Sequence, residues 1–190
     1  TKARLIKAAR LLFVGKAYAE TGTPEIVAAA GVTRGALYHH FSDKGALFHA
    51  VVEQEAAGVA EEVEEASAGK ADALGALFEG GRAYISAMQQ PGRIRLLLLD
   101  GPAILGRDEM DRIDAEHGGR TLREGLFEAM EENIIAQLPL DALSTILSAA
   151  FDRAALSIAG GANADSQLAV LEALISGLRS SSTQSQTCGN

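Results

Sequence analysis

The sequence has little that could crosslink the chain or anchor it in a membrane. Its single cysteine, Cys188, excludes an intrachain disulfide and a zinc site built from several cysteines, and it favours a reducing, cytoplasmic setting. Every stretch as long as the roughly 18 residues of a membrane-spanning helix contains charged side chains, so no span is predicted. The basic N-terminus precedes an apolar run, 11–15, that is shorter than the roughly 7–15 residues of a secretion signal. We therefore expect a cytoplasmic protein.

The composition is that of an ordinary globular chain of 190 residues, with 47% hydrophobic and 22% charged side chains. Ala, Leu, Glu and Arg dominate, no segment has a strand pattern, and an all-α fold follows. We expect helices over 2–18, a short segment ending at 31, 34–40, 44–66, 71–89, 93–105, 107–136, 140–159 and 165–179. The polar segment 180–190 is predicted to be a disordered tail.

Charge divides the chain into two parts. Residues 1–52 carry seven basic and three acidic side chains, whereas 53–190 carry ten basic and twenty-two acidic ones. A small basic unit on an acidic body is typical of a nucleic-acid reader with a separate effector domain, although chance segregation gives the same pattern. The predicted domains are 1–52 and 53–179.

Two short helices joined by a tight turn are expected within 21–44. Either Thr21 or Thr23 can cap the first helix, and Thr33 can cap the second. Gly31 lies at the reversal, where a positive φ is available to glycine at no steric cost. This spacing predicts a helix-turn-helix, whose second helix enters the DNA major groove. The alternative is an ordinary helical hairpin inside a bundle.

The same segment resembles the DNA-binding domain of TetR-family transcriptional regulators, over about the first 50 residues. The matching positions are Phe13, Ile26, Ala30, Gly31, Val32, Thr33, Arg34, Gly35, Leu37, Tyr38, His40, Phe41, Lys44 and Leu47. The Thr-Pro pair at 23–24 departs from the family, which more often has an apolar residue followed by a polar one.

The resemblance implies the DNA contacts residue by residue. Arg34 would read base edges, with the small Gly35 and Ala36 allowing a close approach, and His39 would lie at the groove face. Tyr38 and His40 would donate to phosphates, as would Lys44 together with its backbone N–H. Thr23 and Thr33 are further phosphate candidates. The partner implied is a double-stranded, palindromic operator.

In the larger part, the resemblance implies a body that binds a small-molecule effector and forms a homodimer. An apolar cavity could be lined by Phe78, Tyr84, Met88, Leu97, Ile104, Met110, Ile113, Leu126, Phe127 and Met130. The last two helices would pair with their copies through Leu143, Ile146, Leu147, Ala150, Leu168, Leu171, Leu174, Ile175 and Leu178. In both sets the alternative is plain monomer core, because apolar helical spacing does not separate the two.

No metal, cofactor or catalytic site is predicted. Asp108, Asp111, Asp114 and His117 recur at three-residue steps, which a metal site could use. Interleaved Arg107 and Arg112 favour instead a solvated face held by the pairs 108–112 and 116–120. No phosphate-binding glycine loop, nucleophile elbow or metalloprotease motif is present. The sequence therefore predicts a ligand-responsive regulator, more a repressor than an activator. The alternative is a helical ligand-binding or scaffold protein without DNA binding.

Overall fold

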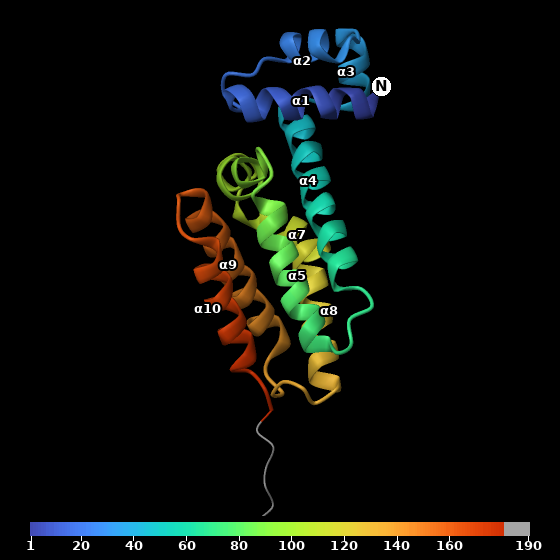
Figure 1. Ribbon diagram of the computed structural model, residues 1–190. Coiled ribbons are helices and arrows are strands. Elements are labelled where there is room, and N and C mark those ends of the chain that lie inside the picture. Colours follow the sequence, from blue (N-terminus) through green and yellow to red (C-terminus); the bar gives the residue numbers. More distant parts are fainter. Residues whose placement is uncertain (181–190) are drawn as a thin grey trace, which may run out of the picture.

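The computed structural model describes residues 1–180 and divides them into a small head and a longer body (Figure 1). The head contains α1, α2 and α3 and lies at one end of α4, with α1 between the body and the other two helices. These helices span Lys2–Lys16, Thr23–Ala30, Arg34–His40 and Lys44–Ser67. Phe13, Ile26, Leu37 and Phe48 are fully buried between them, so the first turns of α4 complete the head's core.

The body packs the rest of α4 against α5, with α8 and α9 beside α5 and α10 beside α9 (Figure 1). Its elements are α5 (Ala73–Met88), the π-helix η1 (Ile94–Asp100), α6 (Gly101–Leu105), α7 (Arg107–Glu116), α8 (Gly118–Glu131), α9 (Leu140–Ala159) and α10 (Ala164–Ser176). Within residues 1–180 there is no strand, only an isolated bridge between Ile135 and Arg179. The predicted all-α class is confirmed.

Two predicted helices differ from the structure. The one expected over 107–136 breaks at His117, and two glycines follow the break. A Cβ at Gly119 would lie 2.9 Å from the Asp114 carbonyl oxygen, so the tight turn requires glycine there. The segment expected at 93–105 begins as a π-helix and continues as α6. A Cβ at Gly101 would lie 2.6 Å from the Leu96 carbonyl oxygen. Both breaks are therefore enforced by close backbone approach.

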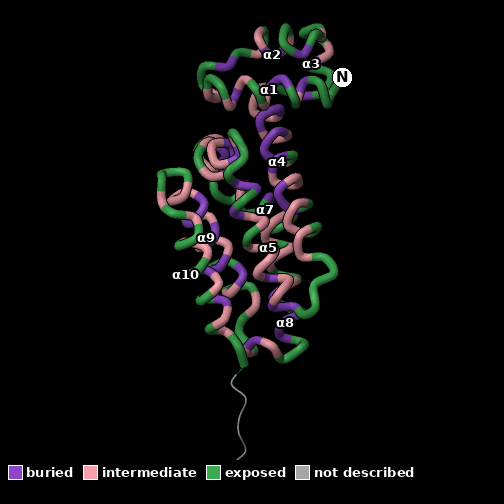
Figure 2. Tube along the Cα trace, in the orientation of Figure 1, coloured by how far each residue is buried: buried purple, intermediate pink, exposed green. Residues whose placement is uncertain are grey.

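One described helix, α9, is long and apolar enough to cross a membrane by length and composition alone. It carries the charged pair Asp152 and Arg153 and packs against α5, α8 and α10. Buried and exposed positions alternate along α9, as in the other body helices (Figure 2). It is therefore a helix of the packed body. The predicted tail, apart from residue 180, lies outside the described residues.

Candidate nucleic-acid interface and internal cavities

The turn between α2 and α3 is held from α1. Gly31 has φ 60° and ψ 43°, the left-handed conformation that the sequence predicts for it. The Nη2 atom of Arg4 donates to the carbonyl oxygens of Ala30 (2.6 Å) and Gly31 (2.7 Å), which satisfies the end of α2. A Cβ at Gly31 would lie 2.9 Å from that same nitrogen. Arg4, which sequence reasoning counted only as charge, therefore fixes the angle between α2 and α3.

The helix caps of the head agree in part with the sequence. The Thr33 hydroxyl accepts a hydrogen bond from the Ala36 amide at 3.2 Å, as predicted for the start of α3. The predicted caps of α2 are wrong. Gly22 occupies the cap position without a side-chain bond, Thr23 is the first helical residue, and the buried Thr21 hydroxyl donates to the Ala17 carbonyl at 2.7 Å. Thr21 therefore bridges α1 to the following loop.

The side chains of four predicted DNA contacts on α3 are exposed, and two of them, Arg34 and Tyr38, lie four residues apart on the same face. Arg34, Tyr38, His39 and His40 are all exposed, and the guanidinium carbon of Arg34 lies 5.5 Å from the centre of the Tyr38 ring. The Thr23 hydroxyl and then the Arg34 guanidinium lower the pKa of Tyr38, because both favour its ionised form. Thr23, Arg34 and Tyr38 therefore form one polar group that joins the start of α2 to α3.

Gly35 has open space around it. A Cβ there would have only the Thr33 hydroxyl within 4 Å, at 3.9 Å, and φ is not in the left-handed region. Nothing within the described chain requires glycine at this position. Because the side chains of Gly35 and the partly exposed Ala36 are small, the backbone at the start of α3 is accessible to a binding partner.

Lys44 is bound more tightly within the head than the sequence indicates. Its Nζ donates to the carbonyl oxygens of Tyr18 (2.9 Å) and Thr21 (3.1 Å) and lies 4.1 Å from the centre of the Tyr18 ring. An ammonium group has three donors, so one remains for a phosphate. The Lys44 side chain thus joins the start of α4 to the end of α1.

Fewer basic side chains are free for DNA than the charge count indicates. Arg10 pairs with Glu55, Lys16 pairs with Glu25, and Arg4 and Lys44 bind carbonyl groups. Among the residues that the structure describes, the basic side chains of the head that bind neither a carboxylate nor a carbonyl group are Lys2, Lys7 and Arg34, the last of which bonds to Tyr38. Much of the positive charge in residues 1–52 therefore serves the architecture.

The head joins the body through buried charges. The Arg10 Nε donates to Glu55 on α4 at 2.5 Å, and its Nη2 donates to the Pro91 carbonyl at 3.0 Å. Arg93 lies 3.5 Å from the same Glu55 carboxylate and pairs with Glu62 at 2.8 Å. Glu55 and Arg93 are both buried. The α1 helix is therefore connected to the segment before η1 as well as to α4.

The body contains two adjoining cavities of about 440 Å³ and 660 Å³. The smaller lies between α4, α5 and α8, and the larger lies between α5, η1, α7 and α9. Tyr84, Asp114, Gly118 and Ser148 line both, so polar groups lie where the cavities meet.

Half of the predicted cavity residues line these spaces. Those that do are Tyr84, Met88, Leu97, Met110 and Ile113. Those that line neither cavity are Phe78, Ile104, Leu126, Phe127 and Met130. Leu126 and Met130 are buried core, whereas Phe127 is 50% exposed. The helical spacing of apolar residues did not distinguish these surroundings.

Sequence reasoning missed the polar residues of the cavities. The Tyr84 hydroxyl donates to Asp152 Oδ1, and the Ser148 hydroxyl donates to Asp114 Oδ2 at 3.3 Å. Burial raises the pKa of both carboxyls, and the charge of Asp114 raises that of Asp152 further. Asp114, interpreted from spacing as part of a solvated face, is exposed and also lines both cavities. No signal in the sequence separates it from Asp108 or Asp111.

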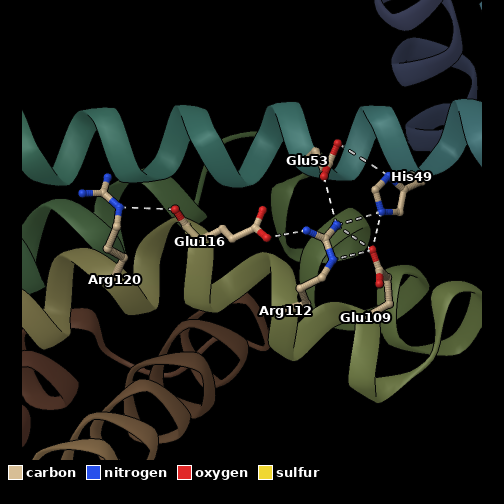
Figure 3. A network of polar contacts seen from close by, with 6 residues as sticks. All are labelled: His49, Glu53, Glu109, Arg112, Glu116 and Arg120. Carbon is tan, nitrogen blue, oxygen red and sulfur yellow. Dashed lines mark hydrogen bonds and ion pairs between the residues drawn. The ribbon is translucent and has the colours of Figure 1, made fainter.

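The opposite side of α7 is bonded to α4 by a cluster of charged groups (Figure 3). Arg112 Nη2 donates to Glu53 on α4 at 3.1 Å and to Glu109 at 2.7 Å. His49 Nε2 lies 2.5 Å from Glu109, and its Nδ1 lies 3.6 Å from Glu53. Arg112 and then His49 lower the pKa of Glu109 to about 2. These four residues, hereafter the α4–α7 cluster, hold the two helices together.

The ion pairs predicted on α7 are wrong in detail. Instead of 108–112 and 116–120, the structure pairs Arg112 with Glu116 and Arg107 with Asp111, and Arg120 Nε reaches the Glu116 backbone carbonyl. The structure brings no three metal-ligating side chains together within residues 1–180.

The predicted dimer residues divide by exposure. Leu147, Leu171 and Ile175 are buried in the protomer and present no surface to a partner, which corrects their assignment. Ile146 and Leu174 are 67% and 52% exposed, and Val170, which sequence reasoning missed, is 60% exposed. The partly buried ones are Leu143, Ala150, Leu168 and Leu178. An apolar strip on α9 and α10 therefore lies open.

Comparison with known proteins accounts for both parts of the chain. Residues 5–51 match the profile described as bacterial regulatory proteins, tetR family, and residues 74–180 match that of the tetracyclin repressor-like C-terminal domain. The transposon Tn10 TetC protein of Escherichia coli is 27% identical over 153 residues, 77% of this chain and 74% of that protein. The HTH-type transcriptional repressor AcnR of Corynebacterium diphtheriae is 26% identical over 182 residues, 93% of this chain and 90% of AcnR.

A solved structure agrees. A TetR-family transcriptional regulator from Pectobacterium atrosepticum is 30% identical to this chain and has a TM-score of 0.74. The match covers 94% of each chain. Regulators of this kind are DNA-binding transcription factors rather than enzymes, and they typically dimerise and bind small-molecule effectors. The helix-turn-helix head, the helical body and both sequence matches identify this chain as a member of the TetR family of transcriptional regulators.

Proposed function

We propose that this regulator is a cytoplasmic repressor that binds a palindromic operator as a homodimer and leaves it when a small molecule occupies the body. One observation carries the proposal: α7 lines the larger cavity with Asp111 and Ile113, while Arg112 between them bonds to Glu53 on α4. The α4 helix runs from that contact into the head, where it begins at Lys44. A ligand that moves α7 therefore acts on the element that carries the recognition helix.

The proposed DNA contacts are Arg34 at base edges, with Gly35, Ala36 and His39 at the groove, and Tyr38, His40, Thr23, Thr33 and Lys44 at phosphates. Their support is the exposure of one side of α3 and the open space around Gly35. The two recognition helices of a dimer must lie about 34–36 Å apart to enter successive major grooves. A tilt of α4 changes that spacing, so operator binding depends on the conformation of the body.

The proposed dimer face is the apolar strip of Ile146, Val170 and Leu174. Its support is exposure, because large apolar side chains gathered on neighbouring helices mark an interaction surface. The two-fold symmetry of such a pair matches a palindromic site. We place the division between DNA-reading and effector-binding domains near residue 52, within α4.

The test begins with an operator selected from a random DNA pool, followed by a thermal-shift screen for ligands and an operator titration with each hit. Moving the dimer from mostly bound to mostly free requires about 5 kcal/mol of differential ligand affinity. Ligands that stabilise the fold strongly and leave operator affinity unchanged would contradict the proposal. In that case the body would serve only to dimerise.

A paired variant locates the connection. Arg112→Ala removes the bonds of Arg112 to Glu53 and Glu109 and leaves the His49–Glu109 contact, whereas Arg123→Ala removes a surface pair with Asp141 that does not touch α4. We expect Arg112→Ala to reduce the ligand-induced change in operator affinity, and Arg123→Ala to leave it unchanged. Equal behaviour of the two variants would show that the signal does not pass through the contacts of Arg112 with α4.

A further inference from the structure

Two aspartates near the junction of the two cavities form no ion pair within residues 1–180, and Arg107 and His117 act on their pKa values only through longer-range charge. Asp114 and Asp152 both line the larger cavity, one from α7 and one from α9. Within residues 1–180, no Lys, Arg or His forms an ion pair with either carboxylate. Their side-chain donors are neutral hydroxyl groups, Tyr84 for Asp152 and Ser148 for Asp114. Asp152 is half-buried and Asp114 is exposed, so the cost of holding the two charges falls mainly on Asp152 unless a cation accompanies them.

Each carboxylate is held in place but not saturated. Tyr84 occupies Oδ1 of Asp152, and Ser148 occupies Oδ2 of Asp114. The other oxygen of each receives no hydrogen bond from a side chain among the described residues. A carboxylate oxygen has lone pairs to accept further donors, so both groups can take a donor from within the cavity.

The remaining walls near the junction are apolar. Met88, Leu97 and Ile113 are buried side chains that line the same cavity, with Val59 and Leu98 beside them. A space of 660 Å³ is large enough for a drug-sized molecule. The cavity thus combines an apolar enclosure with a fixed pair of carboxylates at one place.

The arginines of the cavity lie elsewhere and are mostly paired. Arg107 pairs with Asp111, Arg120 with Glu64 and Glu124, and Arg123 with Asp141, while Arg153 is exposed. Carboxylates thus match the charge of Arg107, Arg120 and Arg123, whereas the exposed Arg153 and the two junction aspartates form no ion pair among the described residues. The charge that a ligand meets at the junction is therefore negative.

We infer that the effector of this regulator is an amphipathic organic cation, an amine or related nitrogen base, whose charged group binds between Asp114 and Asp152 and whose apolar body lies against Met88, Leu97 and Ile113. A primary ammonium group has three N–H donors, enough for one oxygen of each carboxylate. The regulatory role of this cation rests on the proposed function, whereas its binding to the chain is measurable without DNA.

The experiment uses three probes with the same apolar part: phenylbutylamine, phenylbutanol and phenylbutyrate. Calorimetric titration of the full chain is expected to show the amine binding about tenfold or more tightly than the alcohol, and the anion weakest. Equal or tighter binding of the alcohol or the anion would overturn the inference, the latter pointing to the rim arginines. Absence of binding by all three at millimolar concentration would overturn it too.

Matched variants assign the site. Asp114→Asn and Asp152→Asn should each abolish the preference for the amine over the alcohol. Asp141→Asn should retain it, because Asp141 lies at the exposed rim and pairs with Arg123. Thermal unfolding without ligand checks that each variant is folded. Retention of the preference in both junction variants would refute the assignment.

An operator titration with the amine separates this inference from the proposed function. Amine binding that depends on Asp114 and Asp152 but leaves operator affinity unchanged would support the site and defeat the release mechanism. A neutral ligand that binds more tightly than the amine and releases the operator would support the release mechanism and defeat the proposed cation site.

Discussion

The head and the body use their polar residues in opposite ways. In the head, polar side chains serve the backbone: Arg4 and Lys44 bind carbonyl oxygens, and Thr33 caps a helix. In the body, Asp114 and Asp152 face a cavity with unsaturated carboxylates. A duplex has one geometry, so a DNA reader benefits from a rigid frame. A ligand-binding cavity, in contrast, needs polar groups whose hydrogen bonds are made only when the ligand is bound.

The junction between the two parts should be the most sensitive to mutation. Glu55→Ala removes one of the two carboxylates that pair with the buried Arg93. It also removes the carboxylate on α4 that pairs with Arg10. Removing one member of a buried charge group costs about 3 kcal/mol. Urea unfolding should show that loss for Glu55→Ala and almost none for the exposed Glu65→Ala. Similar midpoints for the two variants would mean that the junction contributes little.

Arg34→Ala should cost about 1–3 kcal/mol of binding to the selected operator and relax the choice of one base in each half-site. Its exposed guanidinium has no ion-pair partner in the described chain, so the fold should keep its stability. Lys7→Ala, on the same head, should weaken binding to operator and random DNA alike. Fluorescence anisotropy with both duplexes measures the difference. Equal losses for Arg34→Ala on the two duplexes would disprove base reading.

Lys44→Ala tests whether architecture and DNA binding overlap at one residue. Loss of the phosphate contact should reduce the salt slope of binding by about one, on every sequence. Loss of the bonds to Tyr18 and Thr21 should also lower stability by about 1 kcal/mol. Salt titrations and urea unfolding measure the two effects separately. A lower stability with an unchanged salt slope would assign Lys44 to the frame of the head alone.

Local rules predicted the head well and the body poorly. Gly31 and Thr33 follow from turn and cap chemistry, which depends on neighbours in the chain. Thr21 escaped prediction because it bonds to α1, four residues back, instead of capping α2. The pairing of Arg10 with Glu55 joins residues 45 apart, and no periodicity reveals it.

The helix that carries the cavity shows the limit most clearly. The steps 108, 111 and 114 suggest a single face, yet Asp111 and Asp114 line the larger cavity, whereas Asp108 lines neither cavity. The break at His117 depends on close backbone packing at Gly119, and the sequence shows only two adjacent glycines. Which polar residue enters a cavity is decided by the packing of other helices, so tertiary structure is needed to find it.

The cavity aspartates should reduce stability at neutral pH. Burial raises the pKa of Asp152 in the fold, so the unfolded chain ionises more readily. The folded protein therefore gains stability as pH falls from neutral toward the ordinary aspartate range. The charge of Arg107 lowers the pKa of Asp152 and so opposes this shift. At Asp114, burial and the charge of Asp111 raise the pKa, whereas the charge of His117 lowers it.

Asp152→Asn should accordingly be more stable than the parent chain at about pH 7, with a difference that shrinks toward about pH 4. Asn can still accept the hydrogen bond from Tyr84. Urea midpoints across this range measure the effect, and Asp111→Asn on the exposed face is the control. A variant less stable than the parent at neutral pH would show that Asp152 is a structural acceptor and not a charge kept for a ligand.

Gly35→Ala should give the smallest change in stability and the clearest separation of fold from DNA binding. Alanine favours a helix over glycine, and Gly35 lies in the first turn of α3, so stability should rise by no more than about 0.5 kcal/mol. The added methyl group meets only the Thr33 hydroxyl within the chain, at 3.9 Å. Operator affinity should nevertheless fall, because the methyl group occupies the side of α3 that we assign to the groove. Unfolding and anisotropy on the same sample measure both, with Gly15→Ala on the open surface of α1 as the control. If Gly35→Ala binds the operator as tightly as the parent chain, the start of α3 does not approach the duplex closely, and the DNA-reading surface must be sought nearer Tyr38 and His39.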